Sequence, residues 1–313
     1  MQRVTNDKSL IPPLNPDWLT ALQGAGICLT SLEPIGALVE GLDLGAREPP
    51  PFVVEILELI MAERGFVVFR SDKALGAQDF LQASCWWGGK ALHSTHGVHP
   101  ATPGGNQHIF RLSNDTSQGI LGVGPQWHND GSFNLDTFSH AGYHMVRRAE
   151  HGGGTYFAHQ GAAFDALPPD RQAYWQRLSS VNATSGVVHP VVHEHPITGH
   201  KSVWLHLGMT GAVIEKAPDM DAFCLLDADE LRQLCHDYND LLNAGLKDGY
   251  AMVFEYETND CLFIDNMAVA HRAAAAHLPP EQQGLRIMHR STVKGVHELK
   301  PSFGLPPQLN IYG

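Results

Sequence analysis

Cysteine is scarce in this chain, and long apolar runs are missing altogether. The five cysteines stand at positions 28, 85, 224, 235 and 261, and no two of them form a C-x-x-C pair. An odd number without such a pair argues against a disulfide framework or a zinc ribbon and favours a reducing compartment. Since no run of about 18 apolar residues occurs, we expect no membrane-spanning helix. The opening MQRVTNDKSLIPPLNPDW lacks a signal-peptide core, so we expect a cytoplasmic protein.

Positive charge is also in short supply. The 313 residues include 21 Lys and Arg against 33 Asp and Glu, giving a formal net charge of −12. No basic stripe of the kind that grips nucleic acid is visible, and we expect a small-molecule substrate with neither nucleic acid nor membrane as partner. Homo-oligomerisation stays open. The 43% hydrophobic content suffices for a large core, and we expect one domain over 1–313.

Apolar periodicity predicts short strands with a few helices between them. Helices are expected after the prolines at 49–51 up to Gly65 and over 77–87, 162–178 and 228–244. Strand-like runs cover 65–70, 141–149, 154–160, 187–192, 202–207, 261–266 and 287–295. Residues 1–25 are expected to form an irregular arm, and 90–126 a long loop region near an active site. The pattern indicates a mainly β fold with flanking helices, an antiparallel sandwich or barrel.

The segment His128-Asn129-Asp130 carries the only H-x-D or H-x-E pair. Chance alone predicts about two such pairs in this composition, so the bare pair by itself is more typical of a capped turn or a surface contact than of a metal site. On a strand, however, residues two apart point to the same face. A second histidine from a distant strand would complete a 2-His-1-carboxylate site, as in non-haem Fe(II) oxygenases.

His271 is the best candidate for that second histidine, because it follows the strand-like run 261–266 directly. Arg286 and Arg290 follow His271 in the sequence. Two strands joined by a loop would bring the arginines and His271 into one cavity. A guanidinium there can bind a carboxylate with two hydrogen bonds. The alternative for Arg286 is a surface salt bridge, and for Arg290 a pairing with an acidic neighbour. The histidines at 189, 195, 200 and 206 are expected to be structural.

The order and wording of several segments resemble the taurine dioxygenase/TfdA-type family of 2-oxoglutarate oxygenases. They are EPIGALVEGLDL (33–44), GFVVFR (65–70), QWHNDGSF (126–133), GGGTYFAHQGAAFDALP (152–168), HPVVHEHPITGHKSVWL (189–205), NDCLFIDNMAVAHRA (259–273) and LRIMHRSTVKG (285–295). The resemblance implies a double-stranded β-helix, the jelly-roll or cupin-like core. It implies Fe(II) bound by His128, Asp130 and His271, and Thr155 and Arg286 on the distal carboxylate of 2-oxoglutarate. Arg290 and a loop histidine, His93 or His96, would face the substrate.

The expected function is Fe(II)/2-oxoglutarate-dependent oxidation of an unactivated C–H bond in a small anionic substrate, a carboxylate or sulfonate. O2 is the second cosubstrate, and succinate and CO2 are released. Hydroxylation is the default outcome, and desaturation or oxidative cyclisation of an amino-acid-like substrate is the alternative. Because Asp130 is present, halogenation is not expected. The rival from another class is a metal-binding jelly-roll protein without oxygenase activity.

Overall fold

The computed structural model describes residues 10–46, 48–95, 97–121, 124–217, 222–274 and 278–301. The helices are α1 (Pro16–Gly24), α2 (Pro51–Arg64), α3 (Ala77–Ser84), α4 (Gln160–Ala166), α5 (Pro169–Trp175), α6 (Ala228–Asp248) and α7 (Pro280–Gln283). The strands are β1 (Cys28–Ser31), β2 (Ala37–Glu40), β3 (Phe66–Phe69), β4 (Phe110–Ser113), β5 (His140–Arg147), β6 (Thr155–His159), β7 (Leu178–Asn182), β8 (Val188–Pro190), β9 (Val192–Glu194), β10 (Lys201–Val203), β11 (Thr210–Lys216), β12 (Phe223–Leu225), β13 (Ala251–Phe254), β14 (Cys261–Asp265), β15 (Val269–Ala273), β16 (Ile287–Val293) and β17 (Lys300–Pro301).

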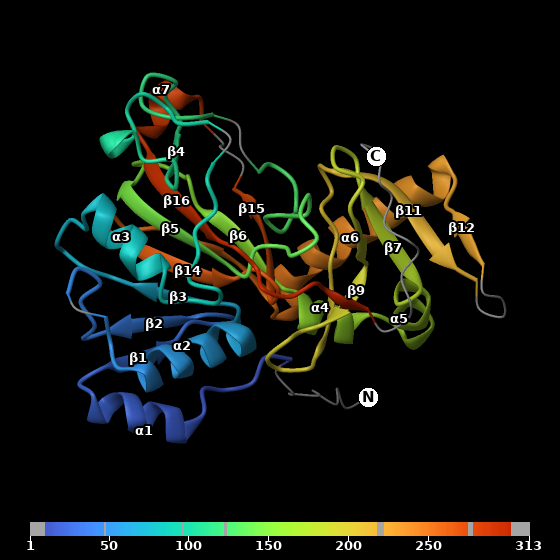
Figure 1. Cartoon of the computed structure of the whole chain (residues 1–313), viewed down its shortest axis with the longest axis horizontal. Helices are drawn as coiled ribbons and strands as arrows, with labels where there is room; N and C mark the ends of the chain where they lie inside the picture. Colours follow the sequence, from blue (N-terminus) through green and yellow to red (C-terminus); the bar gives the residue numbers. More distant parts are fainter. Residues whose placement is uncertain are drawn as a thin grey trace, which may run out of the picture.

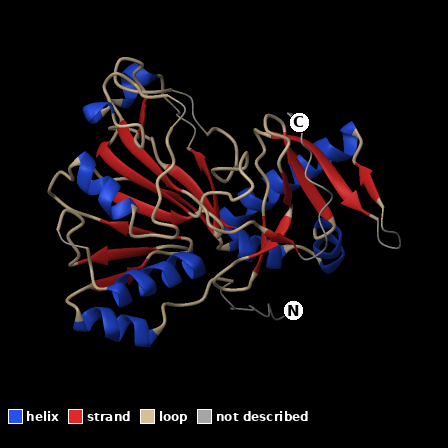
Figure 2. Ribbon diagram, in the orientation of Figure 1, coloured by secondary structure: helices blue, strands red, loops and turns tan. Residues whose placement is uncertain are grey.

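The strands form one large sheet and three small ones. The large sheet has the order β1-β2-β3-β14-β5-β16-β4, and the small ones are β13-β6-β15, β12-β11-β7-β8 and β10-β9-β17. All pairings are antiparallel except that of β2 with β3. Helices α1, α2 and α3 lie with the large sheet, and α4, α5 and α6 lie with the small sheets (Figure 1). Figure 2 shows two groups of strands, those of the large sheet and those of the small sheets, with helices around and between them. The architecture is mainly β, of the jelly-roll type.

The large sheet is apolar on both faces, and side-chain alternation divides it between two cores. Along β14, Leu262 and Ile264 belong to the inner core between the sheets. Their neighbours Cys261 and Phe263 belong to the outer core under α2 and α3. Successive strand residues point to opposite faces, so one apolar strand contributes to both layers.

Helix α2 ends where the sequence predicts, and helix α6 continues beyond its expected end. Helix α2 ends at Gly65, which has a φ of 90° that glycine adopts without steric cost. Helix α6 begins with a capping box between Asp227 and Glu230 and ends at Gly249 with a φ of 82°. It therefore extends one turn beyond the expected 228–244.

Two other expectations are wrong. Part of the expected irregular arm is helical, because Asn15 caps α1 through the N–H of Asp17 and Leu22 is buried in the outer core; residues 1–9 lie outside the described part. The expected helix 162–178 is two helices, α4 and α5. Pro168 interrupts them, since proline lacks an N–H and disfavours helical geometry at the preceding residue.

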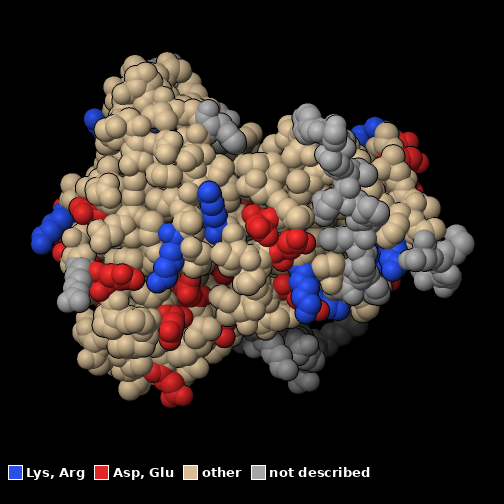
Figure 3. Space-filling model, viewed as in Figure 1, with Lys and Arg blue, Asp and Glu red and all other residues tan. Residues whose placement is uncertain are grey.

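The expected loop region 90–126 also contains regular structure. Strand β4 lies within it and pairs with β16 at the edge of the large sheet. Runs 187–192 and 202–207 form shorter strands than expected, namely β8 with β9, and β10. Among the described helices, none is long and apolar enough to cross a membrane. Basic and acidic side chains are interspersed on the face shown in Figure 3, which has no basic stripe.

Candidate metal centre

His128 and His271 face each other across an isolated antiparallel bridge. The N–H of His128 donates to the carbonyl of His271 at 3.0 Å, and the N–H of His271 donates to the carbonyl of His128 at 2.9 Å. Residues that exchange both backbone bonds have neighbouring side chains. The two ring centroids are 4.2 Å apart. A residue pair remote in sequence is thus placed side by side by two hydrogen bonds.

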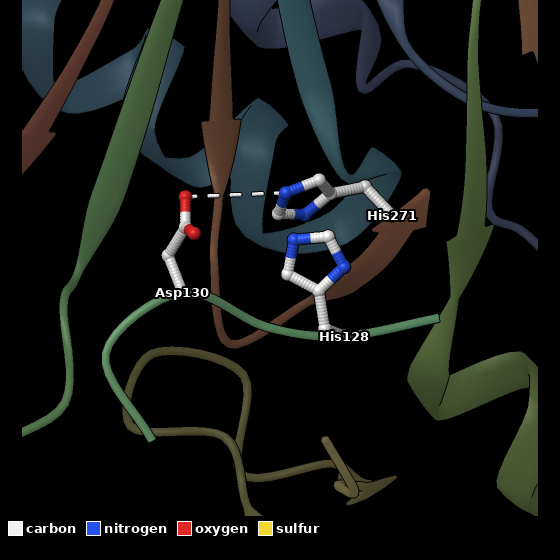
Figure 4. Close-up of side chains that lie close together, drawn as sticks. All are labelled: His128, Asp130 and His271. Atoms are coloured by element: carbon white, nitrogen blue, oxygen red, sulfur yellow. Dashed lines mark ion pairs between the residues drawn. The ribbon is translucent and has the colours of Figure 1, made fainter. Parts of the chain in front are cut away.

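Asp130 completes the group from the same segment as His128 (Figure 4). Its Oδ1 accepts a hydrogen bond from a guanidinium N–H of Arg290 at 3.2 Å. Its Oδ2 is buried without a hydrogen-bond partner and lies 3.9 Å from Nε2 of His271. One ligand atom from each of the three residues lies within 4.8 Å of the others. Burying a carboxylate oxygen that has no hydrogen-bond donor costs folding free energy unless a cation binds it.

The protonation states suit metal binding. Nδ1 of His128 donates to the carbonyl of Gln126 at 2.7 Å, so its Nε2 carries a lone pair. Burial lowers the pKa of His128 and of His271, which keeps both imidazoles neutral. Burial would raise the pKa of Asp130, but Arg290 and the three nearby histidines outweigh this and lower it to about 2. Two neutral imidazoles and one carboxylate are the ligand set of non-haem Fe(II) sites.

Tyr143, on β5, is a contact that sequence reasoning missed. Its hydroxyl lies 3.0 Å from Nε2 of His271. Burial raises the pKa of Tyr143 well above 10, so the hydroxyl stays protonated and donates to Nε2. This hydrogen bond occupies the single lone pair of Nε2, so a metal ion bound at Nε2 would displace the Tyr143 hydroxyl from it. Ala141, Tyr143 and Met145 alternate along β5 and all point into the inner core. That alternation is the sequence signal that could have identified Tyr143.

Thr155 and Arg286 line the same pocket as His128 and His271. Thr155 stands opposite Ala273 in the pairing of β6 with β15, two residues beyond His271. Its Oγ1 accepts a hydrogen bond from the hydroxyl of Tyr256 at 3.2 Å. The structure thus brings together the two residues expected to bind a distal carboxylate and the two histidines expected to bind a metal.

The guanidinium of Arg286 lacks a counter-ion within the described part of the chain. Its Nε donates to the carbonyl of Gly153 at 2.9 Å, and none of the described carboxylates lies within 4.0 Å of it. Burial lowers the pKa of Arg286, but guanidinium remains charged in proteins. Arg286 therefore forms no surface salt bridge with a described carboxylate, which was the alternative expected for it. A partly buried cation without an anion fits a site for an anionic ligand.

Arg290 also lines this pocket, but it does not share a strand with Arg286. Arg290 lies within β16, whereas Arg286 precedes the strand and a register shift falls between Ile287 and Met288. Besides Asp130, Arg290 contacts the ring of Phe110, 4.9 Å from its centroid. The acidic neighbour with which Arg290 pairs is thus itself one of the expected metal ligands.

Neither of the two loop histidines, His93 and His96, is placed in the pocket by the described structure. The N–H of His93 donates to the carbonyl of Thr292 at 2.9 Å, and its ring lies 4.6 Å from that of Phe138. It is not among the residues that line the pocket of Arg286. His96 lies outside the described residues. His206, expected to be structural, lies beside the centre, and its ring is 5.1 Å from that of His128.

Comparison with known proteins agrees with this geometry. The sequence model of the family described as "Taurine catabolism dioxygenase TauD, TfdA family" matches residues 29–292. A putative alpha-ketoglutarate-dependent sulfonate dioxygenase of Schizosaccharomyces pombe is 26% identical over 185 residues, which are 53% of this chain and 44% of that protein. The match therefore spans less than half of that relative's length.

Solved structures share the fold. A putative alpha-ketoglutarate-dependent taurine dioxygenase from Burkholderia xenovorans has a TM-score of 0.71 at 19% identity, covering 90% of this chain and 96% of that one. The structure of AAD-2 in complex with Mn(II) and N-oxalylglycine has a TM-score of 0.68 at 21% identity, covering 87% and 99%. Enzymes of the matched family use Fe(II), 2-oxoglutarate and O2. The chain belongs to the taurine catabolism dioxygenase TauD, TfdA family.

Proposed function

We propose that the chain is an Fe(II)- and 2-oxoglutarate-dependent oxygenase that hydroxylates a C–H bond of a small anionic substrate. The observation that carries the proposal is a pocket lined by His128, His271 and Arg286. Asp130 lies beside the two histidines, and Arg286 has no counter-ion among the described residues. A metal-binding protein with no oxygenase activity would need the candidate ligands and leave Arg286 unexplained. Family membership supports the same reaction class.

His128, Asp130 and His271 would hold the iron through one ligand atom each. Bound iron supplies the redox chemistry: with O2 and 2-oxoglutarate it oxidises the substrate, while the cosubstrate loses CO2 and leaves as succinate. Arg290 holds Oδ1 of Asp130, which leaves Oδ2 as the oxygen directed toward the two histidines. With three protein ligands, the metal would keep coordination positions for the cosubstrate and oxygen.

Arg286 and Thr155 would bind the distal carboxylate of 2-oxoglutarate. The guanidinium offers paired N–H donors that match a carboxylate. Because Thr155 accepts a hydrogen bond from Tyr256, its own hydroxyl proton is free to point at an anion. Burial raises the pKa of Tyr256, so that phenol remains a donor. The hydrogen bond from Tyr256 thus orients the hydroxyl group of Thr155.

The substrate would carry a sulfonate or carboxylate near the reacting carbon. The relative from Schizosaccharomyces pombe is named as a sulfonate dioxygenase. Arg290 is the charged group of this pocket closest to the metal ligands, and with a net charge of −12 only a local cation would attract an anion. His93 and His96 stay proposed as further contacts. Hydroxylation is the outcome we propose.

Two measurements test the proposal. Anaerobic addition of Fe(II) and 2-oxoglutarate should produce the visible absorption band of an iron-bound 2-oxo acid, and a non-oxygenase should show none. In air, succinate release should rise with taurine or another small sulfonate or carboxylate. Absence of the band together with absence of succinate would refute the oxygenase. A band with succinate release that only neutral or cationic substrates stimulate would refute the anionic substrate alone.

A further inference from the structure

Behind the candidate metal ligands lies a set of buried carboxamides. Asn266, fully buried, accepts from the backbone N–H of Asp130 at 2.9 Å. Its Nδ2 donates to the carbonyls of Asp130 at 2.9 Å and of Phe138 at 2.8 Å. The side chain therefore satisfies both backbone groups of a candidate ligand, from a turn that precedes β15.

Asn129 stands between the two candidate ligands of its segment and is also fully buried. Its Nδ2 donates to the carbonyls of Asn266 at 2.6 Å and Val269 at 3.0 Å. Its amide also pairs with that of Gln160, with N···O distances of 2.9 and 2.8 Å in the two directions. Gln160 in turn donates to the hydroxyl of Tyr238 on α6 at 3.2 Å.

We propose that Asn129, Gln160 and Asn266 form a carboxamide clamp that positions the metal-binding group before any metal binds. The inference rests on the proposed metal site and goes beyond it by assigning a role to three residues that are not themselves candidate metal ligands. The clamp joins the segment of His128 and Asp130 to the turn that leads to His271. It also anchors both to Gln160, which follows β6 and begins α4.

The physical reason is the cost of loosening a buried carboxylate. Asp130 is held at its backbone by Asn266 and at one oxygen by Arg290, so its remaining oxygen has little freedom. A ligand group ordered in advance loses less conformational entropy when the metal binds. Outer partners that orient metal ligands typically change metal affinity by roughly 10–100-fold when removed. We expect the clamp residues to fall in that range.

The test compares metal affinity with stability. Mn(II) affinity of the full chain would be measured by calorimetry for the wild type, Asn266→Ala and Gln160→Met, with unfolding free energy measured on the same samples. Gln160→Met removes the amide pair at similar volume and serves if Asn266→Ala does not fold. Co(II) absorption spectra would report the geometry of the bound ion in each folded variant.

A matched control is Gln172→Ala. Gln172 donates through Nε2 to the carbonyls of Phe164 and Leu167, both at 3.1 Å, away from the candidate ligands. It should lose stability with Mn(II) affinity unchanged, whereas the clamp variants should lose roughly 10–100-fold in affinity. Clamp variants that fold and bind Mn(II) as tightly as the wild type would overturn the inference. A wild type that binds no Mn(II) would overturn the metal site itself.

Discussion

Acidification should destabilise the protein through His159, a buried residue at the junction of β6 and α4. Nδ1 of His159 accepts a hydrogen bond from the N–H of Ala162 at 3.1 Å and so caps α4. Burial, followed by the fields of His195 and His200, lowers its pKa from 6.5 to about 3. A protonated ring would turn its N–H toward another N–H at the positive end of a helix.

The sign and size follow from linkage. Because the folded pKa lies below the unfolded value of 6.5, the unfolded chain binds more protons between these values. The stability associated with neutral His159 is fully present above pH 6.5 and is lost as the pH falls toward 3. One such group changes the unfolding free energy by about 1.4 kcal/mol per pH unit. Between about pH 7 and about pH 5 it should contribute a loss of about 2 kcal/mol.

Urea unfolding in the presence of a chelator, at both pH values, measures this loss. The control is His159→Asn, because asparagine is a good helix cap and does not titrate. The wild type should lose about 2 kcal/mol more than His159→Asn on acidification. At high pH the unfolding free energy of His159→Ala should be about 1 kcal/mol lower than that of the wild type, because the helix cap is missing. Equal acid losses for wild type and His159→Asn would refute the reasoning.

The remaining predictions concern the site. His128→Ala, Asp130→Ala and His271→Ala should each abolish succinate release while circular dichroism stays unchanged, since the metal needs all three ligands; full activity in one variant would remove that residue from the site. Arg286→Ala should raise the 2-oxoglutarate requirement on the order of a hundredfold, from a loss of roughly 2–4 kcal/mol. An unchanged requirement would assign the carboxylate contact to Arg290. Arg290→Gln should weaken substrate binding more than Arg290→Lys, with 2-oxoglutarate affinity kept. A neutral or cationic best substrate, indifferent to both changes, would contradict this.

Much of the local structure could be predicted from the sequence because its causes are local. Apolar spacing and Gly65 suffice for α2, and a short continuous apolar run suffices for the buried strand β14. The spacing of His128 and Asp130 predicts a shared strand face. The structure instead has an isolated bridge at His128 and a turn at Asp130, and it still brings their ligand atoms within 4.8 Å of each other. In contrast, Leu178 lies at helical spacing but begins β7, because Pro168 and sheet pairing outweigh the apolar pattern.

The partners of the site residues were decided only by the tertiary structure. Sequence order indicates that His271 belongs with His128, but only the backbone bridge shows that their rings are neighbours. Nothing in the spacing of Arg290 shows that its guanidinium contacts Asp130. The same holds for Tyr143 at His271 and for Asn266 behind Asp130. These contacts join strands far apart in the chain, and their geometry depends on how two sheets pack rather than on any local preference.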